Sequence, residues 1–424
     1  MASNTFAVLN GHFTESYADA VGILPAETAK LVKKIAFVDK EKQTGNLYHQ
    51  PVALSRENGV VFNSDGSAFS TTDPGALPAS YEDAQIRGTE ILIPTQLSYG
   101  AAARALGGKK QFVNETKFLV QQNARAMAHH LELGLLYGQT SIAATSEITA
   151  SGTTGTFVVT AATWAPGIWR GSVGMVLDFF VTIGAAAPIN TNAAITVTSV
   201  NYTTRTVSFT CASGDAANLN SETTGFIFRR RANAGSSSFR ESAGIDKIVT
   251  NTGTLFNISA STYDLWAGNS YDCSGGPLTM FKIQAGLAAA VHAGLDEDVT
   301  IICNPVTWAN VMSDLTALRM FDNSYSSEKA ESGSKGITFY GQNGKIEFMP
   351  HILCKQGEAF AVPLKLFSRI GSTDVTYKMP GMPSEQLLFQ LPNNAGYEFR
   401  SYTDQALFCE APAKLVKFVN ILNV

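Results

Sequence analysis

The chain has 424 residues, of which 45% are hydrophobic and 16% are charged, and its formal net charge at pH 7 is −4. This length and composition predict a large core divided over two or three structural units, and they exclude a largely disordered chain. The sequence has no basic tail of the kind that binds nucleic acid through its phosphates. Its first residues lack the pattern of a secretory signal, and no apolar run is long enough to span a bilayer.

Residues 1–45 are expected to form an arm with one short helix within residues 25–32, where a proline stands near the helix start. Residues 46–100 are rich in glycine and proline, which separate short alternating runs such as 59–62 and 89–93. This pattern predicts an extended two-stranded excursion. An isolated hairpin is only marginally stable in water, so the excursion needs a surface to lie against.

A long helix is predicted from Lys109 to Tyr137. Apolar residues recur there at steps of three and four positions, and glycines stand before and after the segment. At a rise of about 1.5 Å per residue, such a helix is roughly 43 Å long. A helix of that length beside an arm without its own core is typical of a subunit that makes extended contacts with adjacent subunits in an assembly.

Between residues 146 and 228 the composition shifts to Thr, Val, Ala, Gly and Phe. Runs of β-branched and aromatic residues predict a small sandwich or barrel. The Gly- and Ser-rich residues 234–238 are expected to be its exit linker. The predicted strands are residues 156–160, 175–181, 194–200 and 205–210, with a turn at 201–204.

From residue 278 onward the pattern predicts an α+β unit. A helix at 278–295 is followed by a strand at 299–303, an Asn304-Pro305 turn and a helix at 307–318. Further strands are predicted at 337–340, 346–349, 359–362, 406–408 and 414–421.

No catalytic, cofactor or metal site is predicted. The run Asp272-Cys273-Ser274-Gly275-Gly276-Pro277 nearly spells the nucleophile segment of chymotrypsin-like proteases, but a cysteine separates the aspartate from the serine. The matching histidine segment is missing as well, so a Gly-Gly-Pro turn before the next helix is the favoured interpretation. His129 and His130 point in different directions on the predicted helix and lack partners at the spacing of a metal site.

The cysteines predict buried thiols of a protein made in a reducing cytoplasm. They are odd in number, widely spaced and never arranged as C-x-x-C, which argues against disulfides and against a zinc site. They are Cys211, Cys273, Cys303, Cys354 and Cys409.

The order of these parts resembles a major capsid protein of tailed bacteriophages with the HK97 fold. The predicted long helix is similar to the spine helix of that fold, and residues 46–100 are similar to its extended E-loop. Residues 241–269 resemble a stretch common in phage capsid sequences. Residues 301–308 match the hydrophobic strand, Asn-Pro turn and Trp of the axial domain.

The resemblance implies an α+β, HK97-like fold with an inserted small all-β domain. It divides the chain into an N-terminal arm (1–45), the E-loop (46–100), the spine helix and peripheral domain (101–145), an inserted β-barrel or sandwich (146–235), peripheral strands (236–280), the axial domain (281–383) and a C-terminal return to the peripheral domain (384–424).

The resemblance also implies a function, that of a non-enzymatic shell protein. It would self-assemble into hexamers and pentamers of an icosahedral capsid in the host bacterial cytoplasm and enclose double-stranded DNA without sequence-specific binding. A strongly basic lining would trap that DNA, and the net charge of −4 fits its absence. The implied partners are other copies of the chain, a separate scaffolding protein, a portal and a decoration or cement protein, with no membrane.

Three alternatives stay open at this point. The chain could be the shell protein of an encapsulin-like nanocompartment, which would lack a large β insertion. It could be a phage tail or decoration protein that binds through residues 146–235, or a serine hydrolase that uses Ser274.

Contacts between subunits are expected at apolar residues of the arm and the E-loop, because these residues have no local core to join. No lysine stands between Gln43 and Gly108, so the covalent link of the fold's founding member, which uses an E-loop lysine, is not expected. The arm is too short for a built-in scaffold segment, so scaffolding is expected from another protein. The candidate contact residues are Phe6, Val8, Leu9, Phe13, Val60, Phe62, Ile91 and Ile93.

Overall fold

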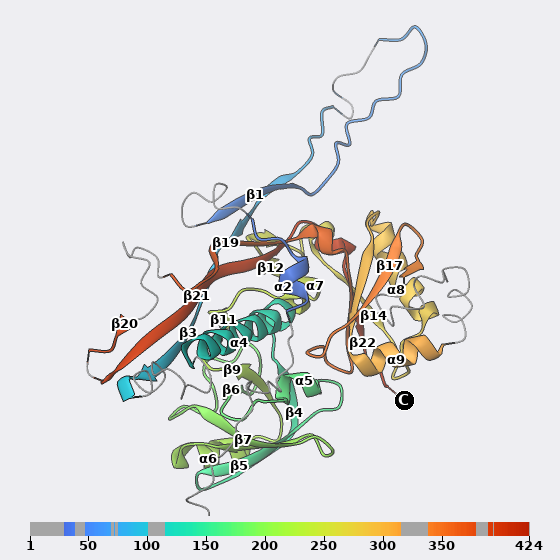
Figure 1. Cartoon of the computed structure of the whole chain (residues 1–424). Coiled ribbons are helices and arrows are strands. Elements are labelled where there is room, and N and C mark those ends of the chain that lie inside the picture. Colours follow the sequence, from blue (N-terminus) through green and yellow to red (C-terminus); the bar gives the residue numbers. More distant parts are fainter. Residues whose placement is uncertain are drawn as a thin grey trace, which may run out of the picture. The chain divides into compact units, whose positions relative to one another are not determined.

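The computed structural model describes residues 29–38, 47–68, 72, 75–100, 115–314, 338–378, 389–392 and 394–423, with only the backbone of residues 115–117 and 338. The chain divides into two compact units. The larger contains Thr28–Ile91, Ala128–Val375 and Thr403–Val424, and the smaller contains the described parts of Leu92–Met127 and Thr376–Tyr402. Figure 1 labels the elements along the chain.

A six-stranded mixed sheet organises one part of the larger unit. β15 pairs in parallel with β17, β14 pairs in parallel with β22, and the remaining neighbours are antiparallel. In spatial order the strands are β14 (Asn269–Asp272), β22 (Val416–Val419), β18 (Ala359–Val362), β15 (Val299–Cys303), β17 (Lys345–Pro350) and β16 (Thr338–Tyr340).

Both faces of this sheet are covered, which explains the apolar runs in its central strands. Ile301 packs with the core beneath helix α8 (Met280–His292), whereas its neighbour Ile302 belongs to a second core on the opposite face. Helix α9 (Pro305–Ser313) starts before the predicted residue 307, because Pro305 suits the first helical position and the Asn304 side chain accepts a hydrogen bond from the amide of Val306. The helix ends at Ser313, before the predicted residue 318, because Asp314 is extended; residues 315–318 lie outside the described residues.

The Thr- and Val-rich region contains a closed antiparallel barrel with strand order β4-β5-β8-β7-β6-β9. Phe157 lies at its centre, with ring centroids 5.1 Å from Phe179 and 5.8 Å from Phe209. Helices α5 (Pro166–Trp169) and α6 (Ser213–Ser221) lie between strands in sequence. The strands are β4 (Ala143–Ser151), β5 (Thr154–Val159), β6 (Val176–Phe180), β7 (Ile195–Asn201), β8 (Thr206–Thr210) and β9 (Gly225–Arg229).

The prediction of an exit linker at residues 234–238 is wrong. β10 (Asn233–Gly235) and β11 (Ser238–Phe239) form a small antiparallel hairpin. Its turn is possible because Gly235, Ser236 and Ser237 all take positive φ angles, of 89°, 52° and 59°.

The long helix α4 spans Glu115–Tyr137 and ends at the predicted residue. The predicted start, residues 109–114, lies outside the described residues. A four-stranded sheet has the order β19-β21-β20, with β3 also paired to β21. Its strands are β3 (Thr89–Ser98), β19 (Phe367–Thr376), β20 (Phe389–Gln390) and β21 (Gly396–Cys409).

Short elements complete the described chain. Helix α2 is a single turn at Leu31–Lys34, later than the helix expected within residues 25–32, of which 25–28 lie outside the described residues. The others are α7 (Ile245–Val249), β12 (Thr254–Leu255), β13 (Ile258–Ser259) and the 3-10 turns at Asp264–Trp266, Leu364–Leu366 and Pro412–Lys414.

The five cysteines are buried free thiols, as predicted. Among the described residues, no helix combines the length and apolar character needed to cross a membrane.

Candidate interaction surface

The described residues within 48–86 form an extended hairpin, as the sequence predicted. β1 (Tyr48–Ala53) pairs antiparallel with β2 (Tyr81–Ile86), from Tyr48 opposite Ile86 to Ala53 opposite Tyr81. At its base, Leu54, Ala84 and Ile86 are buried in a core with Trp266 and Phe408. The base is therefore held by the body of the larger unit.

Beyond the ladder, the two arms of the hairpin are tied by few bonds. The amide of Leu54 donates to the carbonyl of Ser80 at 2.9 Å, and that of Asn58 donates to the carbonyl of Leu77 at 3.2 Å. A Cβ on Gly59 would lie only 2.5 Å from the carbonyl oxygen of Gly75, so the close approach of the arms requires glycine. The predicted strand at 59–62 does not form, because the described residues there make no ladder.

The tip is an ordered polar turn. Asn63 donates through Nδ2 to the carbonyl oxygen of Ser67 at 2.9 Å, and the Ser67 hydroxyl donates to Asn63 Oδ1 at 2.8 Å. Gly66, with φ of 75°, supplies the left-handed residue of the turn.

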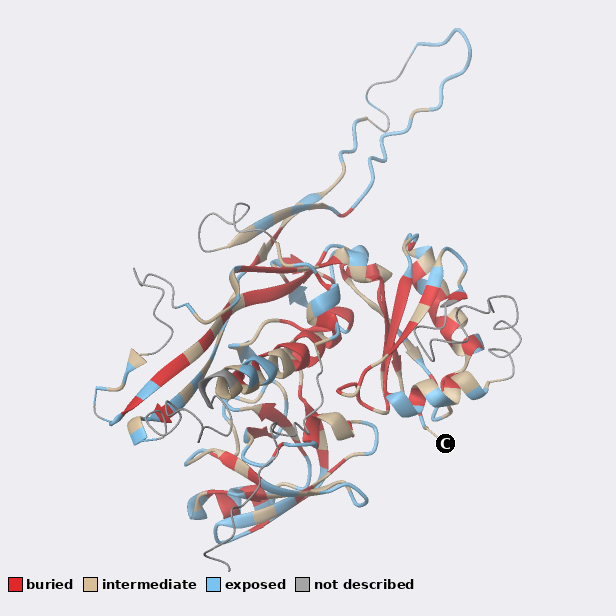
Figure 2. Cartoon of the chain, in the orientation of Figure 1, coloured by how far each residue is buried: buried red, intermediate tan, exposed pale blue. Residues whose placement is uncertain are grey.

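Large apolar side chains of the hairpin are exposed to solvent. Phe62 is 94% exposed, Tyr81 69%, Val60 60% and Leu77 48%. Figure 2 shows most of this segment coloured as exposed. A run of exposed large apolar groups on a segment with little core of its own marks a contact surface for another molecule.

The predicted contact residues fall into three groups. Val60 and Phe62 are exposed, and their role as contact residues stays a prediction. Ile91 and Ile93 alternate with exposed Leu92 and lie half-buried on the other face of β3. Leu77 and Tyr81 were not among the predicted residues but are exposed on the same segment, and their position in a glycine- and proline-rich stretch is the signal that could have added them. Phe6, Val8, Leu9 and Phe13 lie outside the described residues.

Polar contacts fix the hairpin base. Tyr263 donates its hydroxyl to Glu82 at 2.8 Å, and the amide of Gln85 donates to the carbonyl of Phe256 at 2.9 Å. On the exposed side, the His49 ring lies 2.6 Å from Asp83, and this hydrogen bond lowers the pKa of the Asp83 carboxyl.

Glu132, near the end of α4, is a buried anchor for the segment before the hairpin. Its carboxylate accepts the backbone amides of Lys30, Leu31 and Val32 at 2.8, 2.5 and 3.0 Å. The ring Nε2 of His351 lies 2.9 Å from the same carboxylate. Both side chains are fully buried, and the carboxylate satisfies amides at the start of α2 that would otherwise lack acceptors.

The protease-like segment is a structural turn. Asp272 accepts the amide of Ser274 at 2.7 Å and the side-chain amide of Asn420 at 3.0 Å. These bonds, with the Ser274 amide foremost, lower the pKa of the Asp272 carboxyl. Ser274 has φ of 53° and Gly275 of 67°, as a tight turn requires. The aspartate thus binds the turn rather than an imidazole.

The two helix histidines are half-buried. Burial, reinforced by the nearby charge of Arg229, lowers the pKa of His130 to about 3. The Arg229 guanidinium donates to the His130 carbonyl at 2.8 Å and forms a 2.7 Å ion pair with Glu241. Within the described part of the chain, no group of His, Cys, Asp and Glu side chains could hold a metal ion.

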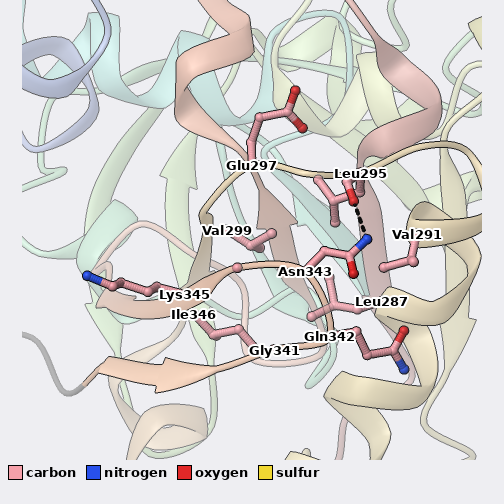
Figure 3. Close-up of a pocket in the computed structure, with 11 residues that line it drawn as sticks. Leu287, Val291, Leu295, Glu297, Val299, Gly341, Gln342, Asn343, Lys345 and Ile346 are labelled. Carbon is pink, nitrogen blue, oxygen red and sulfur yellow. Dashed lines mark hydrogen bonds between the residues drawn. The ribbon is translucent and has the colours of Figure 1, made fainter.

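A small pocket lies between α8 and the turn from β16 to β17 (Figure 3). Its apolar lining includes Leu287, Val299 and Ile346, and the side chain of Asn343 closes one side by donating to the carbonyl of Leu295 at 3.0 Å. Glu297 at the rim is paired with Lys414 at 2.7 Å. The Glu297 carboxylate therefore already has a partner, and the described lining lacks a nucleophile with a base beside it.

Comparison with solved structures identifies the fold. A cyanophage A-1(L) capsid asymmetric unit matches with TM-score 0.59 and 11% identity over 99% of both chains. The capsid of a native GTA particle matches with TM-score 0.53 and 9% identity over 99% of this chain and 100% of that chain. A structure from Mycobacterium phage Bobi matches with TM-score 0.50 and 10% identity over 99% of both chains.

No family model matches the sequence, and no curated protein matches it. At such low identities the structural likenesses establish the fold alone. The chain has the α+β, HK97-like capsid fold that the sequence predicted.

Proposed function

We propose that this chain is a major capsid protein, which self-assembles into hexamers and pentamers of an icosahedral shell around double-stranded DNA. The observation that carries the proposal is a capsid fold whose hairpin leaves Val60, Phe62 and Leu77 in solvent. Burying such side chains is worth about 1.5–3 kcal/mol each, so their contact with another copy would favour assembly.

The charge of the chain supports enclosure of DNA without tight binding. The net charge of −4 gives no general attraction for phosphate, and the clustered Arg229 and Arg230 are paired within the chain with Glu241 and Asp178. The packaged DNA would then be free to enter and leave the shell.

The parts of the chain receive roles from this proposal. Residues 1–45 act as the arm, 46–100 as the E-loop, 101–145 with 236–280 and 384–424 as the peripheral domain, and 281–383 as the axial domain. Residues 146–235 act as the inserted domain, to which β4 adds residues 143–145 as part of the barrel. A separate scaffolding protein, a portal and a decoration or cement protein complete the particle, which assembles in the bacterial cytoplasm.

Negative-stain electron microscopy of the purified, concentrated protein tests the proposal. Closed shells or regular tubes support it. Discrete small oligomers favour the alternative of a tail or decoration protein, and shells that retain a co-purified cargo protein favour a nanocompartment.

Substitutions on the hairpin test the role of its exposed residues. Val60→Ser with Phe62→Ser should leave the melting temperature of the free subunit unchanged, because both side chains are exposed, and should abolish or sharply reduce shell formation. Val173→Ser is a matched control, since Val173 is 69% exposed on a loop of the barrel region. Equal assembly of all three proteins would exclude the hairpin as a contact surface.

A further inference from the structure

Lys417 on β22 lies between two carboxylates in the interior of the larger unit. Its Nζ is 2.6 Å from Oδ1 of Asp246, in the first turn of α7, and 3.1 Å from Oε1 of Glu358, just before β18. Lys417 is 7% exposed and Asp246 is 5% exposed. The three residues come from distant parts of one chain, so the cluster forms only in the folded subunit.

Lys417 is a charged side chain on a buried face of its sheet, where apolar side chains are usual. Val416 and Phe418 belong to the core under α8, so Lys417 points to the other face. There it stands opposite Phe360, with Nζ 5.6 Å from the centre of that ring. A hydrophobic side chain would suit this position at least as well, since buried ion pairs seldom add stability over apolar residues of similar size.

Glu358 provides a second, independent observation. Its Oε1 contacts Lys417, but its Oε2 is buried without any hydrogen-bond partner among the described residues. A buried carboxylate oxygen without a donor is costly, and protonation removes that cost. Glu358 is therefore placed to take a proton from Lys417 and to hold it.

The resting cluster is an ion pair. Burial alone would lower the pKa of the Lys417 ammonium, but the charges of Asp246 and Glu358 outweigh it and raise that pKa. Burial alone would raise the pKa of the Asp246 carboxyl, but the charges of Lys417 and Lys355 lower it. Proton transfer along the 2.6 Å contact converts this pair into an amine and a carboxylic acid.

We propose that Lys417 and Asp246 condense into an intrachain amide bond, with Glu358 as the proton carrier. One proton of the ammonium passes to Asp246, and a second passes through Glu358 to the same leaving oxygen. The nitrogen lone pair attacks Cγ of Asp246, an N–Cγ bond forms, one Cγ–O bond breaks, and the oxygen leaves as water. The ammonium and the carboxylate thus give one amide and one water, and Glu358 ends unchanged.

Two physical factors favour this condensation. Groups held in contact by a fold react with effective molarities that reach on the order of 10⁵–10⁸ M, which offsets the unfavourable equilibrium of amide formation in water. The reaction also replaces two buried charges by one neutral amide, so the desolvation cost of the ion pair disappears.

The intact mass of the full-length protein, measured under denaturing and reducing conditions, is the primary test. We expect a mass lower than that of the sequence by one water molecule. After trypsin digestion, the peptide that contains Asp246 should be joined to the C-terminal peptide. Lys414 serves as an internal control, because trypsin should cut after its free amine but not after the acylated Lys417.

Three variants assign the roles. Asp246→Asn should still form the bond and lose one ammonia instead of one water. Glu358→Gln should keep the full mass, because its amide cannot carry the proton. Lys417→Arg should also keep the full mass, because a guanidinium is a poor nucleophile.

The wild-type protein alone decides the question, whether or not a variant folds. A folded wild-type chain that retains its full mass after prolonged incubation overturns the proposal and leaves a buried ion pair. A linked Glu358→Gln protein would overturn the assignment of Glu358. The inference concerns a single chain and stands apart from the proposed shell function, which is tested by microscopy.

Discussion

At the residue scale, two buried charged groups, Glu132 and Lys417, contact residues that are distant in the sequence. Glu132 joins residues more than a hundred positions away, with Leu31 at a separation of 101 and His351 at 219. A glutamate within an apolar helix pattern gives no sign of such partners in the sequence. The same holds for Lys417, because the alternation of its strand predicts a buried position but not the carboxylates that meet it there.

Glu132→Ala should destabilise the subunit by about 3–5 kcal/mol, because three backbone amides and His351 would lose their acceptor in a dry interior. Urea denaturation measures the change in the free energy of unfolding. Exposed Glu147 supplies the control, since Glu147→Ala should stay within about 0.5 kcal/mol of the parent. A loss below about 1 kcal/mol for Glu132→Ala would show that water replaces the carboxylate.

His130 should make the subunit less stable in mild acid. Its folded pKa of about 3 lies below the ordinary histidine pKa of 6.5, so the unfolded chain binds the proton more tightly. The stability that neutral His130 contributes is complete above pH 6.5 and is lost as the pH falls toward 3. Between pH 7 and 5 the loss should be on the order of 1–2 kcal/mol.

Denaturation curves at several pH values test this expectation, with His130→Asn compared against His292→Asn, whose histidine is exposed. The His130 variant should flatten the pH dependence, whereas the His292 variant should keep it. Equal pH profiles for both variants would contradict the role of His130.

At the element scale, strand bounds were predicted best where burial on both faces of a sheet requires a continuous run of apolar residues. The strands at Val299–Cys303 and Ala359–Val362 have the predicted bounds, because both faces of their sheet are covered and the runs are continuously apolar. β4 was missed because five of its nine residues are Ala or Ser, and its strand conformation depends on pairing with β5 and β9. Pairing with neighbouring strands therefore determined the strand conformation of β4, where the local β propensity is weak.

Independent folding of the barrel should depend on three residues before the composition shift. Ala143, Ala144 and Thr145 pair with β9 opposite Ile227, Phe226 and Gly225, and this pairing closes the barrel. A fragment of residues 139–235 should give dispersed amide resonances, whereas a fragment of residues 146–235, which lacks the closing pairs, should not.

Both fragments lose the same contacts with the rest of the subunit, among them the ion pair of Arg229 with Glu241 and the close packing of Gly167 on the Ile352 backbone, where no Cβ would fit. If both spectra are disordered, these contacts are essential and the barrel is not autonomous. If both are dispersed, the closing pairs are dispensable.

At the scale of the whole molecule, the fold was predictable from the order of parts, whereas contacts between copies stay a prediction. The exposure of Val60 and Phe62 was predictable because a glycine- and proline-rich segment gives apolar side chains no local core. Ile91 and Ile93 are half-buried on β3, and their sequence does not indicate which groups would complete their burial.

Intact particles should contain no covalent links between subunits. No lysine stands between Gln43 and Gly108, so the hairpin offers no amine to a neighbour. Reducing, denaturing gels of particles should show a single band even if the Lys417–Asp246 amide forms, since that bond lies within one chain. A ladder of multiples would contradict this expectation.

Deletion of residues 2–20 should separate folding from assembly. The described part of the arm, residues 29–38, is anchored independently of residues 2–20, because Glu132 accepts the amides of residues 30–32 and Arg369 donates through Nε to the Ile35 carbonyl at 3.0 Å. These bonds survive the deletion, so the free subunit should keep its melting temperature. Shells should be lost or weakened, since Phe6, Val8, Leu9 and Phe13 would no longer bind a neighbour. Particles of normal form and unchanged thermal stability would show that the arm contributes nothing to the interface.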